Sequence, residues 1–461
     1  MYSSVIAAVS TPPGKGGVAL IRMSGEGAFL LAEKIFVAKS KRDIQSYPAR
    51  TEIYGDVIFD GEVLDDGMIA LFPAPNSYTG EDVVEFSIHG GVLNTERVLE
   101  ALFSLGARQA EAGEFTRRAF INGKLSLTEA EAIGTLLEAK SYDQLRLSSA
   151  TSRKRLNDKV SSIRAKMREL LSSMYARIDY PDEDLGDFSS DECIARLEEI
   201  SADLTALKSS YRTGKAICEG INTVICGKPN VGKSSLYNLI FDDDLAIVTD
   251  IAGTTRDVLT GQVPLGRVLL NLSDTAGIRS ESDAETVEKI GIERARRRIS
   301  ECELLICVFD ASRPLSKEDG EIFALKEGLT ANAIAVVNKC DLDLRLEKEK
   351  IEAAFDNVIY ISAKEDAKAK EKLSSLINEL FTDGKISASD DVIISTARQN
   401  ARVVRALDLI DGALTAFRLG ISQDAASSDV ELALGEIGEL DGREVSEEIV
   451  SDIFSKFCVG K

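Results

Sequence analysis

The sequence feature that most constrains this chain is a glycine-rich run between two apolar stretches. Residues 222–241 read NTVICGKPNVGKSSLYNLIF, which places the pattern G-x-x-x-x-G-K-[ST] at 227–234. The pattern predicts a buried strand, a phosphate-binding loop and a helix, because glycines let backbone N–H groups wrap a phosphate at the helix N-terminus. This part of the chain is therefore expected to form an α/β block that binds a nucleotide.

Charged and hydroxyl groups around this loop suit a nucleotide with bound magnesium. The ammonium group of Lys233 is expected to neutralise the β- and γ-phosphates, and the hydroxyl group of Ser234 to ligate Mg²⁺. Asp274 ends the expected strand VLLNLSD, where a carboxylate can reach Mg²⁺ through water. Asp341 follows the expected strand AIAVVN and can accept both guanine N1–H and N2–H₂, a contact that adenine cannot return. The expected ligand is GTP rather than ATP.

The residues expected to bind GTP lie in five short segments, in the chain order of a GTPase. They are Asn230, Val231, Gly232, Lys233, Ser234, Ser235, Thr249, Asp250, Ile251, Ala252, Gly253, Thr254, Thr255, Asp274, Thr275, Ala276, Gly277, Asn338, Lys339, Asp341, Ser362, Ala363 and Lys364.

The water that attacks GTP needs an orienting group that the usual position does not supply. Ile278 follows Gly277, where Ras-like proteins carry a glutamine, and an aliphatic side chain cannot orient water. Thr255, in the segment where switch I is expected, is predicted to give the second hydroxyl ligand of Mg²⁺. The acidic candidates for orienting water are Glu281, Asp283, Glu285, Glu288 and Glu293, and the residues alone do not choose among them.

Apolar periodicity organises the rest of the chain, whose 461 residues suggest three domains at about 150 residues per domain. Residues 1–120 alternate short β-rich runs with turn signals, which predicts an α+β domain. Residues 121–215 and 386–461 show helical periodicity, and an amphipathic helix must cover its apolar stripe with a partner. The two helical regions are therefore expected to pack together, with an α/β block at 216–385 inserted between them.

The expected fold is multidomain α+β and α/β: an N-terminal α+β domain, a discontinuous helical domain and an inserted Ras-like G domain. Two apolar seams support the helical domain. The first consists of Leu156, Val160, Ile163, Met167, Leu170 and Met174, and the second of Val403, Leu407, Ile410, Leu414 and Phe417.

Charge limits the partners that this chain can attract. Lys and Arg number 55 against 76 Asp and Glu, so the net charge of −21 repels nucleic acid overall. The stretch 146–177 is an exception, because its basic residues outnumber its acids by seven. It is either a local RNA contact or a solvated helix face.

Composition excludes several other kinds of site. The single histidine, His89, excludes a mechanism that needs two imidazoles. The seven cysteines include no Cys-x-x-Cys pair, which argues against a disulfide framework and a structural zinc site. The sequence has no apolar run of membrane-spanning length and no signal-peptide pattern at its start, so we expect a soluble cytoplasmic protein with no membrane contact.

Further motifs are spread over the whole chain. They are Pro12-Pro13-Gly14-Lys15-Gly16-Gly17-Val18, Ser77-Tyr78-Thr79-Gly80-Glu81-Asp82-Val83, His89-Gly90-Gly91, Ala112-Gly113-Glu114-Phe115-Thr116, Gly253-Thr254-Thr255-Arg256-Asp257 and Phe457-Cys458-Val459-Gly460-Lys461. Together they resemble the motifs of the MnmE family, also called TrmE, whose members are tRNA uridine-modifying GTPases.

The resemblance implies three sets of site residues. A reduced folate would bind to the N-terminal domain, with its contacts matching Arg22, Glu81, Lys124 and Lys461 and with the thiol of Cys458 close by. A potassium ion would bind in the G domain through residues matching Asn230, Thr249, Ile251 and Thr254, and would supply the charge that an arginine finger supplies elsewhere. The catalytic glutamate of the family matches Glu288, just before the run IGIERA.

The resemblance also implies a reaction and partners. A homodimer would form through the N-terminal domain and join a flavin-containing MnmG-type partner in a heterotetramer. The complex would add an aminomethyl or carboxymethylaminomethyl group to C5 of the wobble uridine of certain tRNAs. The cofactors implied are GTP, Mg²⁺, K⁺ and a reduced folate, either 5,10-methylene-tetrahydrofolate or 5-formyl-tetrahydrofolate.

Two other functional classes are weighed against this one. A ribosome-assembly GTPase would be a switch without covalent chemistry, and the run Gly14-Lys15-Gly16-Gly17 is similar to the GxxG loop of a KH domain. A KH domain needs helices on both sides of that loop, whereas Pro12-Pro13 precede it and a strand-like run follows. A purely mechanical G-domain dimeriser would leave the N-terminal third without a ligand.

Overall fold

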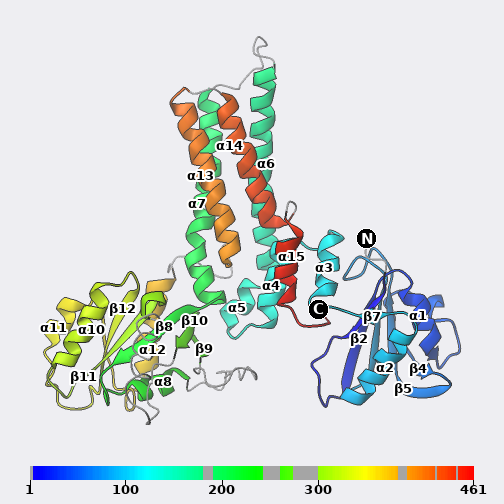
Figure 1. Cartoon of the computed structure of the whole chain (residues 1–461), viewed down its shortest axis with the longest axis horizontal. Coiled ribbons are helices and arrows are strands. Elements are labelled where there is room, and N and C mark those ends of the chain that lie inside the picture. The colour runs from blue at the N-terminus through cyan, green and yellow to red at the C-terminus, as the bar shows by residue number, and fades with distance from the viewer. Residues whose placement is uncertain are drawn as a thin grey trace, which may run out of the picture. The chain divides into compact units, whose positions relative to one another are not determined.

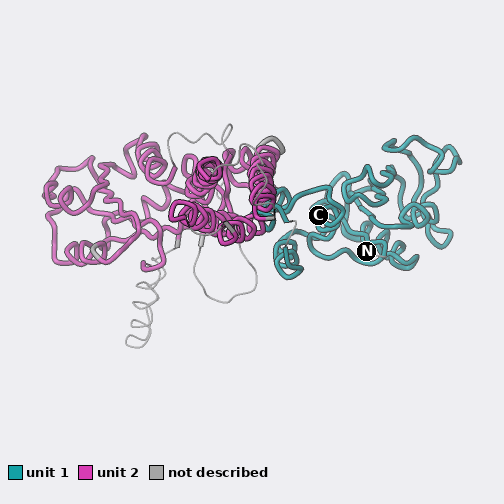
Figure 2. Tube along the Cα trace, turned by 90° about the horizontal axis from the view of Figure 1, so that it is seen from above, with its two compact units in different colours: residues 1–134, 437–461 teal, residues 135–436 magenta. Residues whose placement is uncertain are grey.

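The computed structural model describes residues 4–179, 190–241, 260–273, 299–382, 392–420, 423–442 and 445–460. The chain divides into two compact units, Met1–Gly134 with Ile437–Lys461 and Thr135–Glu436 (Figure 2). Each mixes helices with a sheet (Figure 1), as the multidomain α+β and α/β prediction requires. The finer division into three domains, with boundaries at 120, 215 and 385, stays a prediction.

The first unit is built on a seven-stranded sheet in the order β3-β4-β5-β6-β2-β1-β7. The strands are β1 (Ile6–Val9), β2 (Val18–Ser24), β3 (Phe36–Ala38), β4 (Ile53–Phe59), β5 (Glu62–Phe72), β6 (Val83–His89) and β7 (Arg108–Gln109). Only the β1–β7 pair is parallel among these described strands.

The two faces of this sheet differ in cover. Helices α1 (Ala28–Ile35) and α2 (Val92–Ser104) pack on one face, and the residues pointing to them form a single apolar core. On the other face α3 (Glu114–Ile121) supplies Phe115, which packs with Ile6 and Ala8 of β1. Farther along that face Val18 and Met68 are 64% and 42% exposed. We call the part of this face away from α3, on β2, β5 and β6, the open face.

The C-terminal residues complete the first unit. Helix α15 (Glu447–Ser455) packs with α3 and with α4 (Leu127–Leu137) through a cluster that includes Phe454 and Leu127. After α15, Val459 bridges to Ala112 and the hydroxyl group of Ser10 donates to the carbonyl oxygen of Gly460 at 2.9 Å. The two ends of the chain therefore meet in one unit.

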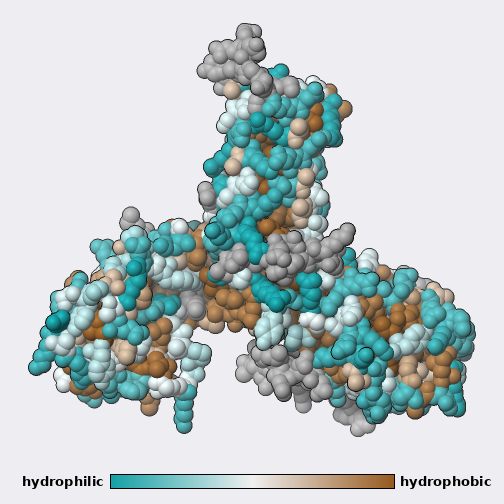
Figure 3. Space-filling model, turned by 180° about the vertical axis from the view of Figure 1, so that it is seen from behind, coloured by the Kyte–Doolittle hydropathy of each residue, from teal (hydrophilic) through white to brown (hydrophobic). Residues whose placement is uncertain are grey.

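Long helices form the first part of the second unit. They are α6 (Ala150–Asp179), α7 (Ser190–Cys218), α13 (Ala397–Arg418) and α14 (Gln423–Asp441), with the short α5 (Tyr142–Leu147) beside α6 and α7. Helix α7 packs along α13 and also against α6 (Figure 1). Every residue of both predicted seams is buried, and Figure 3 shows largely hydrophilic outer surfaces on these helices with apolar side chains between them. The predicted pairing of the two helical regions is confirmed.

Three of the nine basic residues in the stretch 146–177 take part in this packing. The ammonium groups of Lys159 and Lys166 lie 2.6 Å and 2.9 Å from carboxylate oxygens of Asp203 on α7. Arg164 is buried, and Lys166 also pairs with Glu199. At these three positions the stretch serves helix packing, and the role of its other basic residues stays a prediction.

An α/β block follows α7. Its sheet has the order β13-β12-β11-β8-β10-β9, all parallel neighbours except the antiparallel β9–β10 pair. The strands are β8 (Ile221–Gly227), β9 (Thr260–Leu265), β10 (Val268–Ser273), β11 (Leu304–Asp310), β12 (Asn332–Asn338) and β13 (Asn357–Tyr360). Helices α8 (Lys233–Phe241) and α12 (Ala369–Phe381) cover one face, and α10 (Lys317–Glu327) and α11 (Lys348–Ala354) the other.

None of the described helices has both the length and the apolar character that crossing a membrane requires.

Candidate functional site

The phosphate-binding loop leaves β8 at Gly227, and its backbone explains why glycines stand at both ends. Gly227 has a φ of +152°, and a Cβ atom there would lie 2.6 Å from the carbonyl oxygen of Val308 on the neighbouring strand. Gly232 has a φ of +101°, and Asn230 between them has a φ of +66°. Asparagine tolerates this left-handed region better than most residues, so the sequence fits the turn at all three positions.

The loop lysine lies across the loop. The ammonium group of Lys233 donates to the carbonyl oxygens of Gly227 at 2.8 Å and Lys228 at 2.7 Å. Lys228 in turn pairs with the buried carboxylate of Asp319 on α10 at 2.5 Å, which fastens the loop to that helix. The loop is thus held in shape by its own carbonyl groups and one buried acid.

Asn338, at the end of β12, joins three of the predicted segments. Its amide nitrogen donates to the carbonyl oxygen of Val231 at 3.0 Å, and its amide oxygen accepts from the backbone N–H of Ala363 at 2.9 Å. The side chain is buried, and a Cβ atom at Gly232 would lie 2.1 Å from its nitrogen. The structure therefore brings together the phosphate loop, the expected base-reading segment and the segment at 362–364.

Lys339 adds a second tie and reveals a residue that the sequence analysis missed. Its ammonium group donates to the carbonyl oxygen of Asn230 at 2.7 Å and lies 2.6 Å from the carboxylate of Asp310, at the end of β11. Burial would raise the pKa of Asp310, but hydrogen bonds from Lys339 and Ser312 outweigh it and lower that pKa. An aspartate that ends an otherwise apolar strand was the available signal.

The remaining predicted GTP residues fall into three groups. Ser235 on α8 is half-buried, and Ser362 is buried. Ser234, Asp341 and Lys364 lie exposed at the same edge of the sheet, where ligands bind in parallel α/β folds. The others, namely Thr249, Asp250, Ile251, Ala252, Gly253, Thr254, Thr255, Asp274, Thr275, Ala276, Gly277 and the proposed catalytic Glu288, lie outside the described residues.

In the first unit, Arg22 of β2 lies on the sheet face that α3 partly covers. Its Nε donates to Glu85 on the paired strand β6 at 2.8 Å, and its guanidinium carbon is 5.5 Å and 5.7 Å from the ring centres of Tyr78 and Phe115. These distances are those of cation–π contacts. The arginine is thereby held among two rings and a carboxylate.

Glu81 belongs to a buried ionic network that includes Ser24, two residues after Arg22 on β2. Its Oε2 accepts from the Ser24 hydroxyl group at 2.7 Å and from Arg118 at 2.9 Å. Arg118 is fully buried and also pairs with Glu114 at 2.9 Å. Burial would raise the pKa of Glu114, but hydrogen bonds from Arg108, the Glu111 amide and Arg118 lower it. Arg118 was not predicted, although Glu114 stands in one of the motifs.

The other residues predicted to bind folate are Lys124, Cys458 and Lys461. The ammonium group of Lys124 donates to the carbonyl oxygen of Pro75 at 3.0 Å. Cys458 is exposed, and its carbonyl oxygen accepts from the N–H of Gly113 at 3.3 Å, which sets the C-terminal segment beside the Glu114 network. Lys461 lies outside the described residues.

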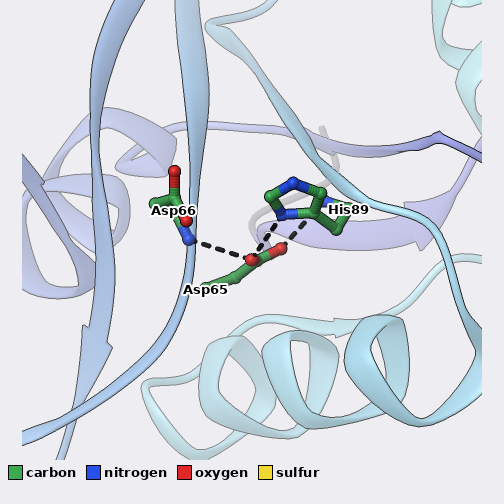
Figure 4. A group of neighbouring side chains, drawn as sticks. All are labelled: Asp65, Asp66 and His89. Carbon is green, nitrogen blue, oxygen red and sulfur yellow. Dashed lines mark hydrogen bonds and ion pairs between the residues drawn. The ribbon is translucent and has the colours of Figure 1, made fainter.

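His89 forms a dyad with Asp65 at the end of β6 (Figure 4). The imidazole Nδ1 lies 2.8 Å from Asp65 Oδ1, while the backbone N–H of His89 and the Asn94 amide donate to Oδ2. Asp66 is close enough for one metal ion to reach all three side chains, but N–H groups already occupy both Asp65 oxygens. The arrangement therefore favours an imidazole oriented by Asp65 over a metal site.

Comparison with known proteins covers the whole chain. A sequence model described as "MnmE helical domain" matches residues 127–458, and one described as "GTP-binding protein TrmE N-terminus" matches residues 5–124. The tRNA modification GTPase MnmE of Clostridioides difficile (strain 630) is 38% identical over 459 residues, covering 99% of both chains. The proteins of that name from Thermoanaerobacter sp. (strain X514) and Listeria innocua are each 37% identical, over the full length of both chains.

The dyad predicts a raised pKa for His89, which is simple to measure because the chain has one histidine. The hydrogen bond and the charge of Asp65 raise the pKa of His89 above 6.5, so nuclear magnetic resonance of the one imidazole should show a titration above that value. Asp65→Asn should lower this pKa, whereas the neighbouring Asp66→Asn should change it much less. Because the folded pKa is the higher one, the associated stability is present at low pH and is lost as pH rises through it. Equal titration in all three proteins would contradict the dyad.

Proposed function

The chain belongs to the MnmE family of tRNA modification GTPases, and from this membership we propose its reaction. The chain binds and hydrolyses GTP. With a flavin-containing MnmG-type partner it adds an aminomethyl or carboxymethylaminomethyl group to C5 of the wobble uridine of certain tRNAs. The observation that carries the proposal is the similarity over the full length of the relatives, which reaches the N-terminal unit as well as the nucleotide-binding block. A ribosome-assembly switch would not need that N-terminal similarity.

The experiment for this reaction compares tRNA nucleosides by mass spectrometry in cells with and without this chain. Cells lacking it should lose the aminomethyl-type wobble uridines, and the intact gene should restore them. A Ser234→Ala gene should restore them poorly, because the hydroxyl group proposed to ligate Mg²⁺ is gone. An unchanged nucleoside profile in the deletion would contradict the proposed reaction.

GTP would bind at the carboxyl edge of the second sheet. Backbone N–H groups of the loop and Lys233 would hold the phosphates, while Ser234 and Thr255 would hold Mg²⁺, which supplies charge neutralisation at the β–γ bridge. Asp341 is exposed at that edge, and its neighbour Lys339 is fixed by Asp310 and Asn230. The aspartate is therefore well placed to accept the N–H groups of guanine.

Asp341→Asn should weaken GTP binding and improve the relative binding of xanthosine triphosphate. The amide group can donate to the C2 carbonyl of xanthine, whereas the carboxylate can accept only from guanine. Competition between the two nucleotides, measured by displacement of a fluorescent GDP, checks this. Asp343→Asn, at an exposed position two residues on, is the matched control and should keep the preference for guanine. A variant at 341 that still prefers guanine as strongly would contradict the base assignment.

We further propose that the Arg22 region binds a reduced folate. Arg22 suits the glutamate carboxylate of a folate. Within the described chain both hydrogen bonds to the Glu81 carboxylate go to Oε2, which leaves Oε1 available to accept from a pterin N–H group. The rings of Tyr78 and Phe115 add apolar surface beside the arginine. Bound there, the folate would supply a one-carbon unit, and Lys124, Lys461 and Cys458 would complete the site.

Arg22→Ala should abolish binding of 5-formyl-tetrahydrofolate but leave GTP hydrolysis intact, because the phosphate loop lies in the other unit. Calorimetry of the folate and a GTP turnover assay on the same preparation measure the two effects. Arg97→Ala is the matched control, because Arg97 also pairs with a glutamate, Glu62, but lies away from the Tyr78 and Phe115 rings. Normal folate affinity in the Arg22 variant would remove this site.

We propose that potassium supplies the positive charge for hydrolysis. The Asn230 side chain lies exposed at the edge of the phosphate loop, where its amide oxygen can ligate a cation together with Thr249, Ile251 and Thr254. Glu288 would orient the attacking water, since Ile278 cannot. The same cation would order the surface through which two G domains meet. This contact would be additional to the homodimer formed by the N-terminal units.

GTP hydrolysis should therefore be faster in potassium than in sodium, and Asn230→Ala should lose this stimulation while keeping most nucleotide affinity. Glu288→Ala should hydrolyse GTP at least ~10²-fold more slowly, the usual scale for losing a general base. Turnover assays in matched potassium and sodium buffers measure both. Asn238→Ala, which removes an exposed asparagine of α8, is the matched control and should keep the potassium response. Equal rates in the two salts would rule the cation out.

A further inference from the structure

Two cysteines face each other on adjacent strands immediately before the phosphate loop. Cys226 on β8 and Cys307 on β11 are register partners in the parallel sheet, and their sulfur atoms are 3.5 Å apart. Neither thiol belongs to a site predicted from the sequence. We propose that this thiol pair is a modification site, where a hydroperoxide forms a reversible disulfide that weakens nucleotide binding.

The two thiols differ in access, which assigns their roles. Cys226 is half-buried, whereas Cys307 is fully buried within the core under α10. The hydrogen bond from Cys226 and burial raise the pKa of Cys307, so it is the poorer nucleophile toward a reagent from solvent. Cys226 is therefore the thiol that a hydroperoxide meets, and Cys307 is the resolving thiol beside it.

The chemistry balances with the hydroperoxide as the oxidant. The Cys226 thiol loses its proton, the thiolate attacks one peroxide oxygen, and the O–O bond breaks. Cys226 becomes a sulfenic acid, and the departing hydroxide or alkoxide takes up the released proton and leaves as water or an alcohol. The Cys307 sulfur then attacks the sulfenic sulfur, the S–O bond breaks, and the hydroxide takes the Cys307 proton and leaves as water. The two thiols lose two electrons in total, and the hydroperoxide gains them.

Closing this bond must move the strand that carries the phosphate loop. A disulfide needs a sulfur separation of about 2.05 Å and a Cβ–Cβ distance of about 3.8 Å, whereas neighbouring strands lie about 4.8 Å apart, so the two backbones must approach as well as the sulfur atoms. Gly227 follows Cys226 directly and already lies tight against Val308, the residue after Cys307. Its carbonyl oxygen also accepts from Lys233. A shift of β8 toward β11 would therefore displace the loop backbone and the lysine that hold the phosphates.

The same strain makes the disulfide reversible. A disulfide formed against the geometry of its strands has a higher reduction potential, and thiol reductants cleave it readily. The pair therefore suits a response to oxidant that ends when the oxidant is removed. It is unsuited to a permanent cross-link.

The test uses the full chain and hydrogen peroxide, and it rests on the nucleotide binding proposed above. Tryptic mapping of the oxidised protein should show a peptide linking Cys226 to Cys307. Affinity for a fluorescent GDP should fall by about tenfold or more and return after dithiothreitol, a change of about 1.4 kcal/mol. Cys226→Ala and Cys307→Ala should each abolish both the link and the loss. Cys302→Ala, a buried thiol of the same block, is the matched control and should keep both.

The two proposals fail in different ways. If the reduced protein does not bind GDP, the nucleotide site is wrong, whereas the disulfide can still be mapped. If peroxide oxidises Cys340 or Cys458 but yields no link between Cys226 and Cys307, the modification site is wrong. A complete link with unchanged GDP affinity would equally overturn the proposal. Cys226→Ala retains the fully buried thiol, so the test stands even if Cys307→Ala fails to fold.

Discussion

The packing of α7 on α13 is the contact on which the second unit depends, because it holds both ends of the α/β block. Helix α7 enters the block at β8, and the chain returns through residues 392–395 before α13. A Cβ atom at Gly214 of α7 would lie 2.1 Å from the Ile394 carbonyl oxygen, and the Ile394 N–H donates to the buried hydroxyl group of Ser210. The chain that returns from the α/β block therefore packs against α7, the helix that leads into it. The core between α7 and α13 is continuous although the block lies between them in the sequence.

Within the α/β block, the buried side-chain amide of Asn338 holds two loops together. Asn338 bonds to the phosphate loop with its nitrogen and to the segment at 363 with its oxygen, so two loops from different strands share one side chain. A buried polar group is costly unless its partners are met, and here the nitrogen and the oxygen of the amide each have one. The free-energy cost of burying the amide is therefore offset only when both loops are in place. This couples the shape of the phosphate site to that of the base site.

Sequence periodicity predicted the parts of the fold that depend on local pattern. Both helical seams and the glycine-rich loop follow from spacing along one element, and the structure buries or bends those residues as predicted. The Asp65–His89 dyad and the Arg118 network could not be predicted, because they join residues 24 and 37 positions apart, the first across neighbouring strands and the second between α3 and the segment before β6. Asp310 was missed for the same reason, since its partner Lys339 comes from the next strand. The segments with Thr255 and Glu288 lie outside the described residues, so their roles stay predictions.

The Arg118 network is better explained by orientation than by stability. Removing an arginine from water costs several kcal/mol, and well-packed apolar residues often replace a buried ion pair without loss. What apolar residues cannot do is fix a carboxylate. Arg118 reaches Glu81, Glu114 and the Ser4 carbonyl oxygen at once, so its position is overdetermined and it fixes the carboxylate of Glu81. A site that must present an arginine and a glutamate as neighbours, without letting them neutralise each other, needs separate partners for both. Here Glu85 pairs with Arg22 and Arg118 pairs with Glu81, so each of these two residues proposed to bind a folate has its own partner.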